Sequence, residues 1–158
     1  MTEDARFEDG GEGPLRLKAQ DQEDLRIISS LVQDAVFPVA EMSWRPRQRR
    51  FAILLNRFRW EDAMGAAPRL RGFQRVQSVL VAESVLKVTS QGMDRRSKDL
   101  VMSLLNVAFT PHEDGMGDIV LTLAGDGALR LSVECLDLSL KDVTRPYVAP
   151  SGQAPRHA

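Results

Sequence analysis

The chain has 158 residues, and its 21 lysines and arginines against 22 aspartates and glutamates give a formal net charge of −1. A chain of this size buries about 70% of the surface that its unfolded form exposes, so we expect a self-sufficient hydrophobic core. One cysteine excludes an internal disulfide framework and, with two histidines, leaves little for a zinc site. No apolar run reaches the roughly 20 residues of a membrane span, and the acidic first residues do not resemble a secretory signal. We therefore expect a cytoplasmic protein with no bound cofactor and no membrane contact.

The two ends of the chain differ in composition from its middle. Residues 1–14 contain five acidic residues, one arginine and several Gly and Pro residues, which predicts a disordered acidic N-terminus. Residues 144–158 contain Pro146, Pro150 and Pro155 among small and polar residues, which predicts a disordered tail. No interior stretch has the composition of a linker, so residues 15–143 are predicted to form a single domain.

The first predicted elements are a short extended piece at residues 15–18 and a helix after it. Asp21 is a suitable N-cap, and Leu25, Ile28 and Leu31 follow at helical spacing. Several β-branched residues in the same segment leave a strand as the alternative. The cap and the spacing favour one helix near the N-terminus.

From residue 36 onward the apolar pattern changes to a period of two. Residues 36–44 and 49–60 flank a turn at Pro46, which predicts a first hairpin. Residues 73–90 are predicted to form one long strand with one solvent-exposed face. Residues 100–109 are apolar on both parities, which predicts a central strand covered on both sides, with a helix as the alternative.

The last predicted hairpin has its turn at Gly125-Asp126-Gly127, where glycines supply the positive φ that hairpin turns need. Apolar residues fall on odd positions up to Cys135 and on even positions after it, which predicts a bulge or a new strand partner near that residue. The fold class that follows is α+β and predominantly antiparallel. We expect about six to seven strands in successive hairpins, arranged as two layers, a small barrel or a pleckstrin-like roll, with one N-terminal helix.

Four segments of the chain, taken together, resemble a bacterial domain-of-unknown-function family of short single-domain proteins. They are LVQDAV (residues 31–36), RFAILLNRFRWE (50–61), SQGMD (90–94) and VEC (133–135). The resemblance covers most of residues 15–143. It implies a stand-alone bacterial cytoplasmic protein, and it supplies no activity, cofactor or catalytic residue.

The strongest anomaly in the sequence is an uneven distribution of charge. Residues 44–75 contain nine arginines, no lysine and only two acidic residues. Arginine binds phosphate and carboxylate groups in a bidentate manner and stacks on aromatic rings. The candidate interaction surface therefore combines arginines with tryptophans: Trp44, Arg45, Arg47, Arg49, Arg50, Arg57, Arg59 and Trp60.

Two functions fit this surface, and a purely structural role competes with both. Arginines with interleaved aromatics are typical of a groove for single-stranded nucleic acid. Arginines on strands also form solvated faces, pair with acidic residues of the same chain or protect sheet edges. We favour a non-enzymatic interaction module that binds a protein partner or self-associates, with nucleic-acid or anionic-ligand binding as the alternative.

Catalytic and metal sites have weak support in the sequence. His112, Glu113, Asp114 and Asp118 form an acidic turn, but its spacing is not that of a calcium loop. Cys135 shares its parity with apolar neighbours and is predicted to be buried, without a base beside it. An enzyme is therefore the least favoured hypothesis, and no catalytic, cofactor-binding or metal-ligating residue is assigned.

Overall fold

The computed structural model describes residues 14–59, 74–94, 96–143 and 147–148. This part of the chain forms one α-helix and eleven antiparallel strands, with three short 3-10 helices, η1 (Val39–Glu41), η2 (Pro46–Gln48) and η3 (Glu113–Gly115). The helix is α1 (Gln22–Leu31). The strands are β1 (Arg16–Ala19), β2 (Val36–Pro38), β3 (Met42–Arg45), β4 (Arg50–Phe58), β5 (Gln74–Ala82), β6 (Val85–Gln91), β7 (Val101–Pro111), β8 (Gly117–Leu123), β9 (Gly127–Val133), β10 (Leu138–Asp142) and β11 (Tyr147–Val148).

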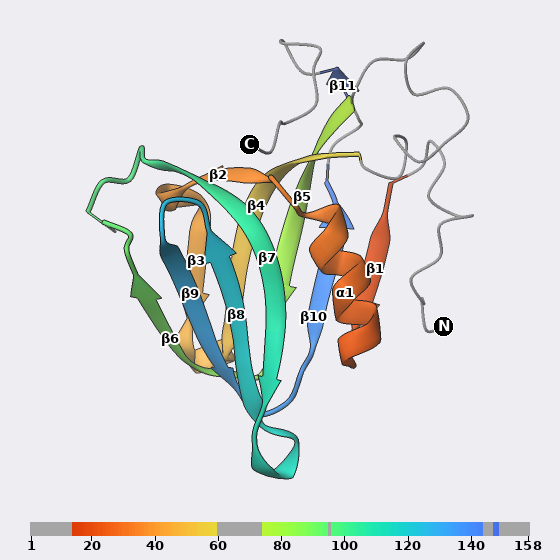
Figure 1. The fold of residues 1–158 in the computed structure, drawn as a ribbon, viewed down its shortest axis with the longest axis vertical. Helices are drawn as coiled ribbons and strands as arrows, with labels where there is room; N and C mark the ends of the chain where they lie inside the picture. Colours follow the sequence, from red (N-terminus) through yellow and green to blue (C-terminus); the bar gives the residue numbers. More distant parts are fainter. Residues whose placement is uncertain (1–13, 60–73, 95, 144–146, 149–158) are drawn as a thin grey trace.

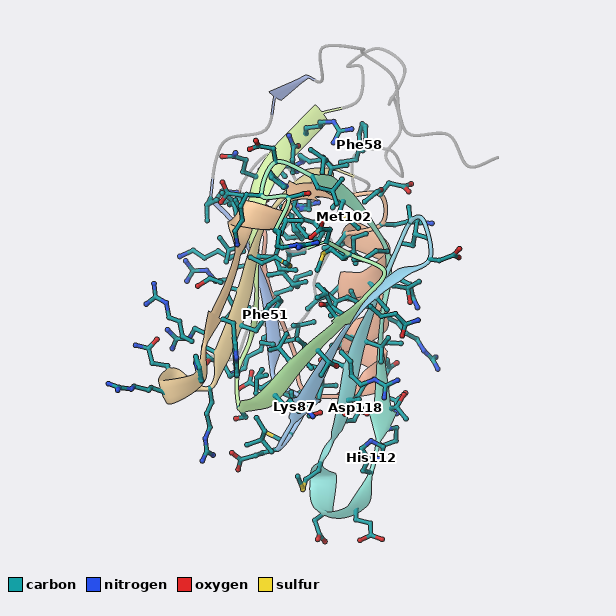
Figure 2. The ribbon with its side chains drawn as sticks, turned by 90° about the vertical axis from the view of Figure 1, so that its left-hand side faces the viewer. Phe51, Phe58, Lys87, Met102, His112 and Asp118 are labelled. Carbon is teal, nitrogen blue, oxygen red and sulfur yellow. The ribbon has the colours of Figure 1, made fainter. Side chains whose placement is uncertain are left out.

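The strands follow the order β1-β10-β5-β4-β2-β7-β8-β9-β6, with β3 paired to β4 and β11 paired to β5. This sheet bends over on itself, so that β7, β8, β9 and β6 form one layer and β3, β4, β5, β10 and β1 form the other (Figures 1 and 2). The predicted α+β class is confirmed. Among the described residues the sheet has more strands than predicted, and β1 and β6 remain its two ends, so it is not a closed barrel.

The core lies between the two layers, because burial alternates along the strands that face it. In β8 and β9, Ile119, Leu121, Leu129 and Leu131 are buried, whereas the intervening side chains are half-buried or exposed. This alternation is expected for antiparallel strands with one wet face.

The short strand β2 connects the layers. Val36 pairs with Asn56 of β4 on one side and with Ser103 of β7 on the other. Phe37, between these ladders, is fully buried and belongs to the core. The strand order therefore passes from one layer to the other through these three residues.

Helix α1 lies between β7 and β1 and covers that side of the core (Figure 1). Asp24 N donates to Asp21 Oδ1 at 2.8 Å, which confirms the predicted N-cap. Leu25, Ile28 and Leu31 are buried at the predicted spacing. In the part of the chain that the structure describes, no helix is long and apolar enough to cross a membrane.

Both predicted hairpin turns are confirmed. Arg45 pairs with Arg50 across η2, and Leu123 pairs with Gly127 across a turn in which Gly125 has a φ of 80°. The predicted change of partner after Cys135 is also confirmed, because β9 ends at Val133 and the next strand, β10, joins β1 and β5 in the other layer.

Two predicted strands are broken in the structure. Residues 36–44 form β2 and β3 with the 3-10 helix η1 between them. Residues 74–91 form two strands in different layers, because the chain turns at Ser84, whose φ is 58°. Apolar residues recur with a period of two on both sides of each break, so the sequence pattern predicts one strand where the structure has two.

Three other predictions fail on exposure or extent. One face of β7 is open, and Val101 is 59% exposed, so the strand is not covered on both sides. Cys135 is exposed rather than buried, because β9 has already ended before it. The predicted tail contains β11, since Tyr147 and Val148 lie between the prolines and pair with Arg75 and Gln74 of β5.

Candidate functional site

The candidate surface begins with a hairpin turn that carries four exposed arginines, Arg45, Arg47, Arg49 and Arg50, here called the basic hairpin. Pro46 starts the turn, where its fixed φ suits the first helical position. Arg49 ends the turn in the left-handed region, with a φ of 53°. Figure 2 shows this turn at the margin of the molecule, with nitrogen-tipped side chains extending outward.

Two of these arginines fix the basic hairpin to the body of the protein. Arg49 forms an ion pair with Glu134, just after β9, and Arg50 Nε donates to both Glu83 oxygens at 3.0 and 3.1 Å. The backbone oxygen of Arg49 accepts from Val85 N at 2.8 Å. These contacts hold the turn against the start of β6.

The other two arginines are available for a partner. Arg45 and Arg47 are exposed, and within the described ranges neither has a carboxylate at ion-pair distance. Trp44 of β3 is half-buried and packs against the core cluster. The basic hairpin therefore presents two guanidinium groups, with the adjacent tryptophan packed against the core.

Two further arginines of the predicted surface are buried. Arg57 and Arg59 are 0% and 3% exposed, respectively, so the prediction that they lie on an interaction surface is wrong. Trp60 lies outside the described residues. Strand β4 runs from the basic hairpin into the interior, and its far end, at Arg57 and Phe58, is buried beside β5.

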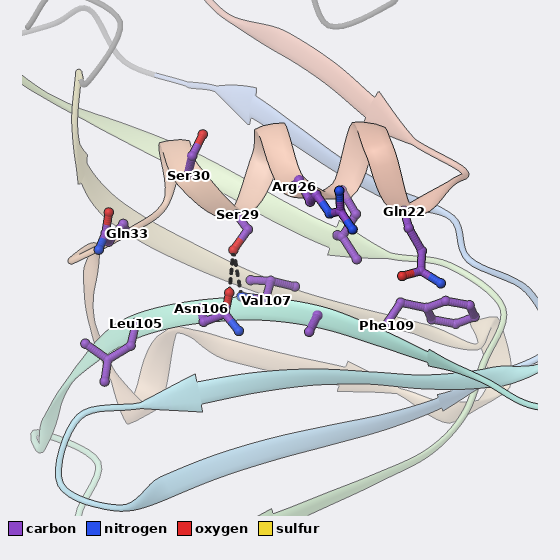
Figure 3. A pocket seen from close by; sticks show the side chains of 11 residues that line it. Gln22, Arg26, Ser29, Ser30, Gln33, Leu105, Asn106, Val107 and Phe109 are labelled. Atoms are coloured by element: carbon purple, nitrogen blue, oxygen red, sulfur yellow. Dashed lines mark hydrogen bonds between the residues drawn. The ribbon is translucent and has the colours of Figure 1, made fainter. Parts of the chain in front are cut away.

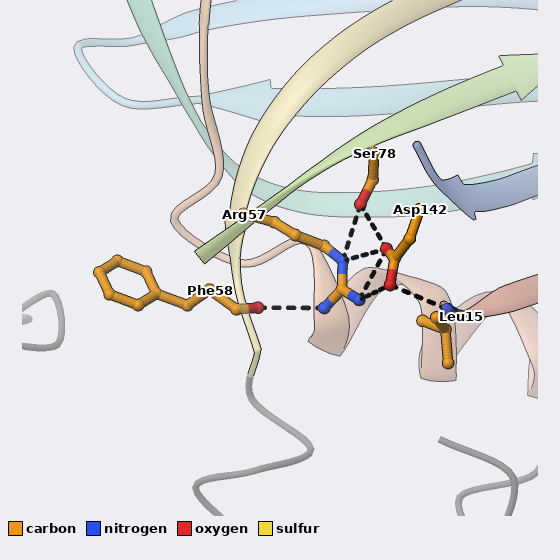
Figure 4. Close-up of polar contacts among 5 residues, drawn as sticks. All are labelled: Leu15, Arg57, Phe58, Ser78 and Asp142. Carbon is orange, nitrogen blue, oxygen red and sulfur yellow. Dashed lines mark hydrogen bonds and ion pairs between the residues drawn. The ribbon is translucent and has the colours of Figure 1, made fainter. Parts of the chain in front are cut away.

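Arg57 forms a buried ionic network with Asp142 and Ser78 (Figure 4). Arg57 Nη2 donates to Asp142 Oδ1 at 2.9 Å, and Arg57 Nε donates to Ser78 Oγ at 3.0 Å. Ser78 Oγ donates to Asp142 Oδ1 at 2.6 Å, and Leu15 N donates to Asp142 Oδ2 at 2.8 Å. The network joins β4, β5 and β10 with the residue that precedes β1.

Two further contacts beside this network involve Phe58, at the end of β4. Arg57 Nη1 donates to the backbone oxygen of Phe58 at 3.1 Å. The Arg75 guanidinium lies 3.7 Å from the centroid of the Phe58 ring, within the range of a cation–π contact. These arginines serve the fold, and they do not extend the basic hairpin.

The acidic turn at η3 brings together only part of the predicted cluster. His112 Nε2 lies 3.1 Å from Asp118 Oδ2, while the Glu113 and Asp114 side chains are exposed in an open recess of about 570 Å³. Among the described residues, no group of three or more His, Cys, Asp or Glu side chains is placed to hold a metal ion. The geometry forms a hydrogen-bonded pair, His112 and Asp118, at the base of this turn.

The pair predicts a pH dependence of stability. The hydrogen bond from His112, assisted by one from Ser132, holds the pKa of Asp118 below its usual value, against the opposing effect of burial. A lowered folded-state pKa stabilises the protein above the unfolded value of about 3.9, and this contribution is lost as the pH falls through the folded value. We expect the stability advantage of the wild type over Asp118→Asn to shrink as the pH falls below about 4.

Urea unfolding of both proteins across this pH range measures the difference. Asp126→Asn is the control, because Asp126 is exposed in the β8–β9 turn. Parallel curves for wild type and Asp118→Asn down to the lowest pH would contradict the assignment.

Comparison with known proteins gives a family but no activity. A family model whose description is "Protein of unknown function" matches residues 15–157, which is most of the chain and confirms the predicted resemblance to an uncharacterised family. No curated protein and no solved structure matches the chain.

Proposed function

Because the chain belongs to the DUF2948 family, whose function is unknown, we propose from its geometry that it is a non-enzymatic interaction module. The basic hairpin would bind an acidic surface of a protein partner. The observation that carries this proposal is the exposed pair Arg45 and Arg47, which has no carboxylate partner in the described part of the chain.

The anchoring of the turn supports a binding role. Arg49 and Arg50 use their guanidinium groups to hold the turn in place, so the backbone under Arg45 and Arg47 is fixed before a partner arrives. A fixed backbone lowers the conformational entropy that binding has to overcome. Exposed charges of this kind contribute mainly to the rate and specificity of association.

A protein partner fits the basic hairpin better than a nucleic acid does. Binding of single strands requires aromatic side chains on which bases stack, together with a row of phosphate contacts. Trp44 packs against the core, and Arg57 and Arg59 are buried, so the described surface offers two guanidinium groups without an adjoining aromatic platform.

A titration against defined probes tests the proposal. The probes are a fluorescein-labelled peptide of alternating Glu and Ser, a single-stranded oligothymidylate and a DNA duplex, followed by anisotropy over a salt series. We expect the acidic peptide to bind most tightly, and the double variant Arg45→Gln, Arg47→Gln to weaken it by about tenfold.

The matched control is the double variant Arg16→Gln, Arg130→Gln, which removes the same charge from exposed positions outside the basic hairpin. If both double variants lose the same affinity for the acidic peptide, net charge alone explains the binding, and the proposal is overturned. Preferential binding of either nucleic acid, with a steep salt dependence that the hairpin variant removes, would replace the protein partner by nucleic acid.

A further inference from the structure

A groove of about 490 Å³ runs between α1 and β7, on the outer side of the core (Figure 3). Gln22, Arg26 and Ser29 line it from the helix, and Asn106 and Phe109 line it from the strand. The volume falls in the range of ligand-binding clefts. No residue of the basic hairpin lines this groove, so the two surfaces are separate.

A β-bulge shapes the strand side of the groove. The register between β7 and β8 shifts between Leu104 and Asn106, and Leu105 and Asn106 are both exposed although they are consecutive. In a regular strand, consecutive side chains point to opposite faces. The bulge therefore turns both the Leu105 and the Asn106 side chains outward, as bulges beside binding sites do.

Ser29 of α1 fixes this bulge. Val107 N donates to Ser29 Oγ at 2.9 Å, and Ser29 Oγ donates to Asn106 Oδ1 at 2.9 Å (Figure 3). The carboxamide oxygen of Asn106 is thereby occupied, and its two N–H donors have no partner in the part of the chain that the structure describes. The helix and the bulge together orient an amide that can donate to a ligand.

The groove also has a defined charge. Arg26 is its only charged lining residue, it is exposed, and it has no ion pair within the described segments. An unbalanced guanidinium favours a carboxylate or a phosphate, with which it forms charge-assisted hydrogen bonds.

The length of the groove distinguishes a chain segment from a compact ligand. Leu105 and Phe109 are apolar lining residues four positions apart on β7, which corresponds to about 13 Å of strand. The Asn106 amide and the Arg26 guanidinium lie between these two contacts (Figure 3). An extended peptide of about four residues spans the same 13 Å and offers main-chain carbonyls and side chains along this length.

We propose that this groove binds an extended segment of a partner protein that carries a carboxylate side chain. Asn106 Nδ2 donates to a main-chain carbonyl of the segment, and Arg26 pairs with its carboxylate. Leu105 and Phe109 contact apolar side chains at either end. This site is independent of the basic hairpin, and its failure would leave the proposal for the hairpin untouched.

Selection from a phage-displayed library of short random peptides on the full-length protein tests the site. We expect enrichment of peptides with one Asp or Glu flanked by apolar residues. The variant Arg26→Glu should select Lys or Arg at that position instead, a reversal that a structural role for Arg26 would not produce. Arg26→Gln should weaken a selected peptide by about tenfold or more, whereas Arg130→Gln, an exposed control outside the groove, should not.

A second variant blocks the groove without changing its charge. Ala108 is exposed and lines the groove, so Ala108→Trp should abolish binding of the selected peptide. Thr89→Trp, at an exposed position of β6, should leave it intact. Selection without an enriched motif, or a motif that still binds Ala108→Trp, would overturn the proposal. Concentration-dependent self-association that Ala108→Trp removes would overturn it in favour of a second copy of the chain.

Discussion

Replacement of Asp142 by Asn is expected to lower the free energy of unfolding by about 3–5 kcal/mol, because it removes the carboxylate charge that pairs with the buried Arg57 guanidinium. Both side chains are 0% exposed, so water cannot compensate. The same substitution weakens the acceptor for Ser78 Oγ and Leu15 N. Urea unfolding followed by circular dichroism measures the change.

A double variant separates the removal of one partner from the removal of the pair. Arg57→Leu combined with Asp142→Leu should be less destabilising than either single substitution, since an apolar pair carries no desolvation cost. The control Lys18→Gln breaks an exposed ion pair with Asp137 at 3.7 Å and should change stability by less than about 1 kcal/mol. Additive effects of the two leucine substitutions would show that Arg57 and Asp142 are not coupled.

Replacement of Phe37 by Ala is expected to cost about 3–5 kcal/mol, the range for deleting a fully buried aromatic side chain. Phe37 is 0% exposed, and it lies in the three-residue strand that links β4 and β7. The cavity would open at the junction of the two layers. We therefore expect increased hydrogen exchange in β2 and the paired part of β7, in addition to the loss measured by urea unfolding.

Val101→Ala is the control for this prediction. Val101 pairs with Pro38 of the same strand β2, but its side chain is 59% exposed. Its replacement should change the free energy of unfolding by no more than about 0.5 kcal/mol. Equal effects at Phe37 and Val101 would show that the ladder, and not the buried ring, stabilises the junction.

Local chemistry made several elements predictable from the sequence. Asp21 caps α1 through a bond to a residue three positions away, and Gly125 supplies the positive φ of the β8–β9 turn. Pro46 marks the turn of the basic hairpin. In each case the residues that determine the geometry are neighbours in the chain.

Long-range contacts determined the features that the sequence did not reveal. Arg57 is buried because Asp142, 85 residues later in the chain, neutralises its charge. Its position on the same strand as the exposed arginines therefore predicted an exposed side chain, which is wrong. The turn at Ser84 is fixed partly by its backbone oxygen, which accepts from Glu134 N in another segment. Neither partner can be identified from spacing alone.

The groove beside α1 was missed for a related reason. Leu105 and Asn106 interrupt the alternation of β7, and apolar residues at both odd and even positions predict a strand covered on both sides. A bulge produces the same pattern when one extra residue shifts the register. The parity change at residues 104–106 was the available signal.

The carboxylate that pairs with Arg57 also brings the start of β1 and the end of β10 together. Leu15 and Asp142 exchange hydrogen bonds, since Leu15 N donates to the Asp142 carboxylate and Asp142 N donates to the Leu15 backbone oxygen. Arg57 lies seven residues along β4 from Arg50, so this corner is about 23 Å from the basic hairpin. The basic hairpin and this corner therefore lie at opposite ends of β4, and a partner held at the hairpin would be separated from the start of β1 by nearly the full length of that strand.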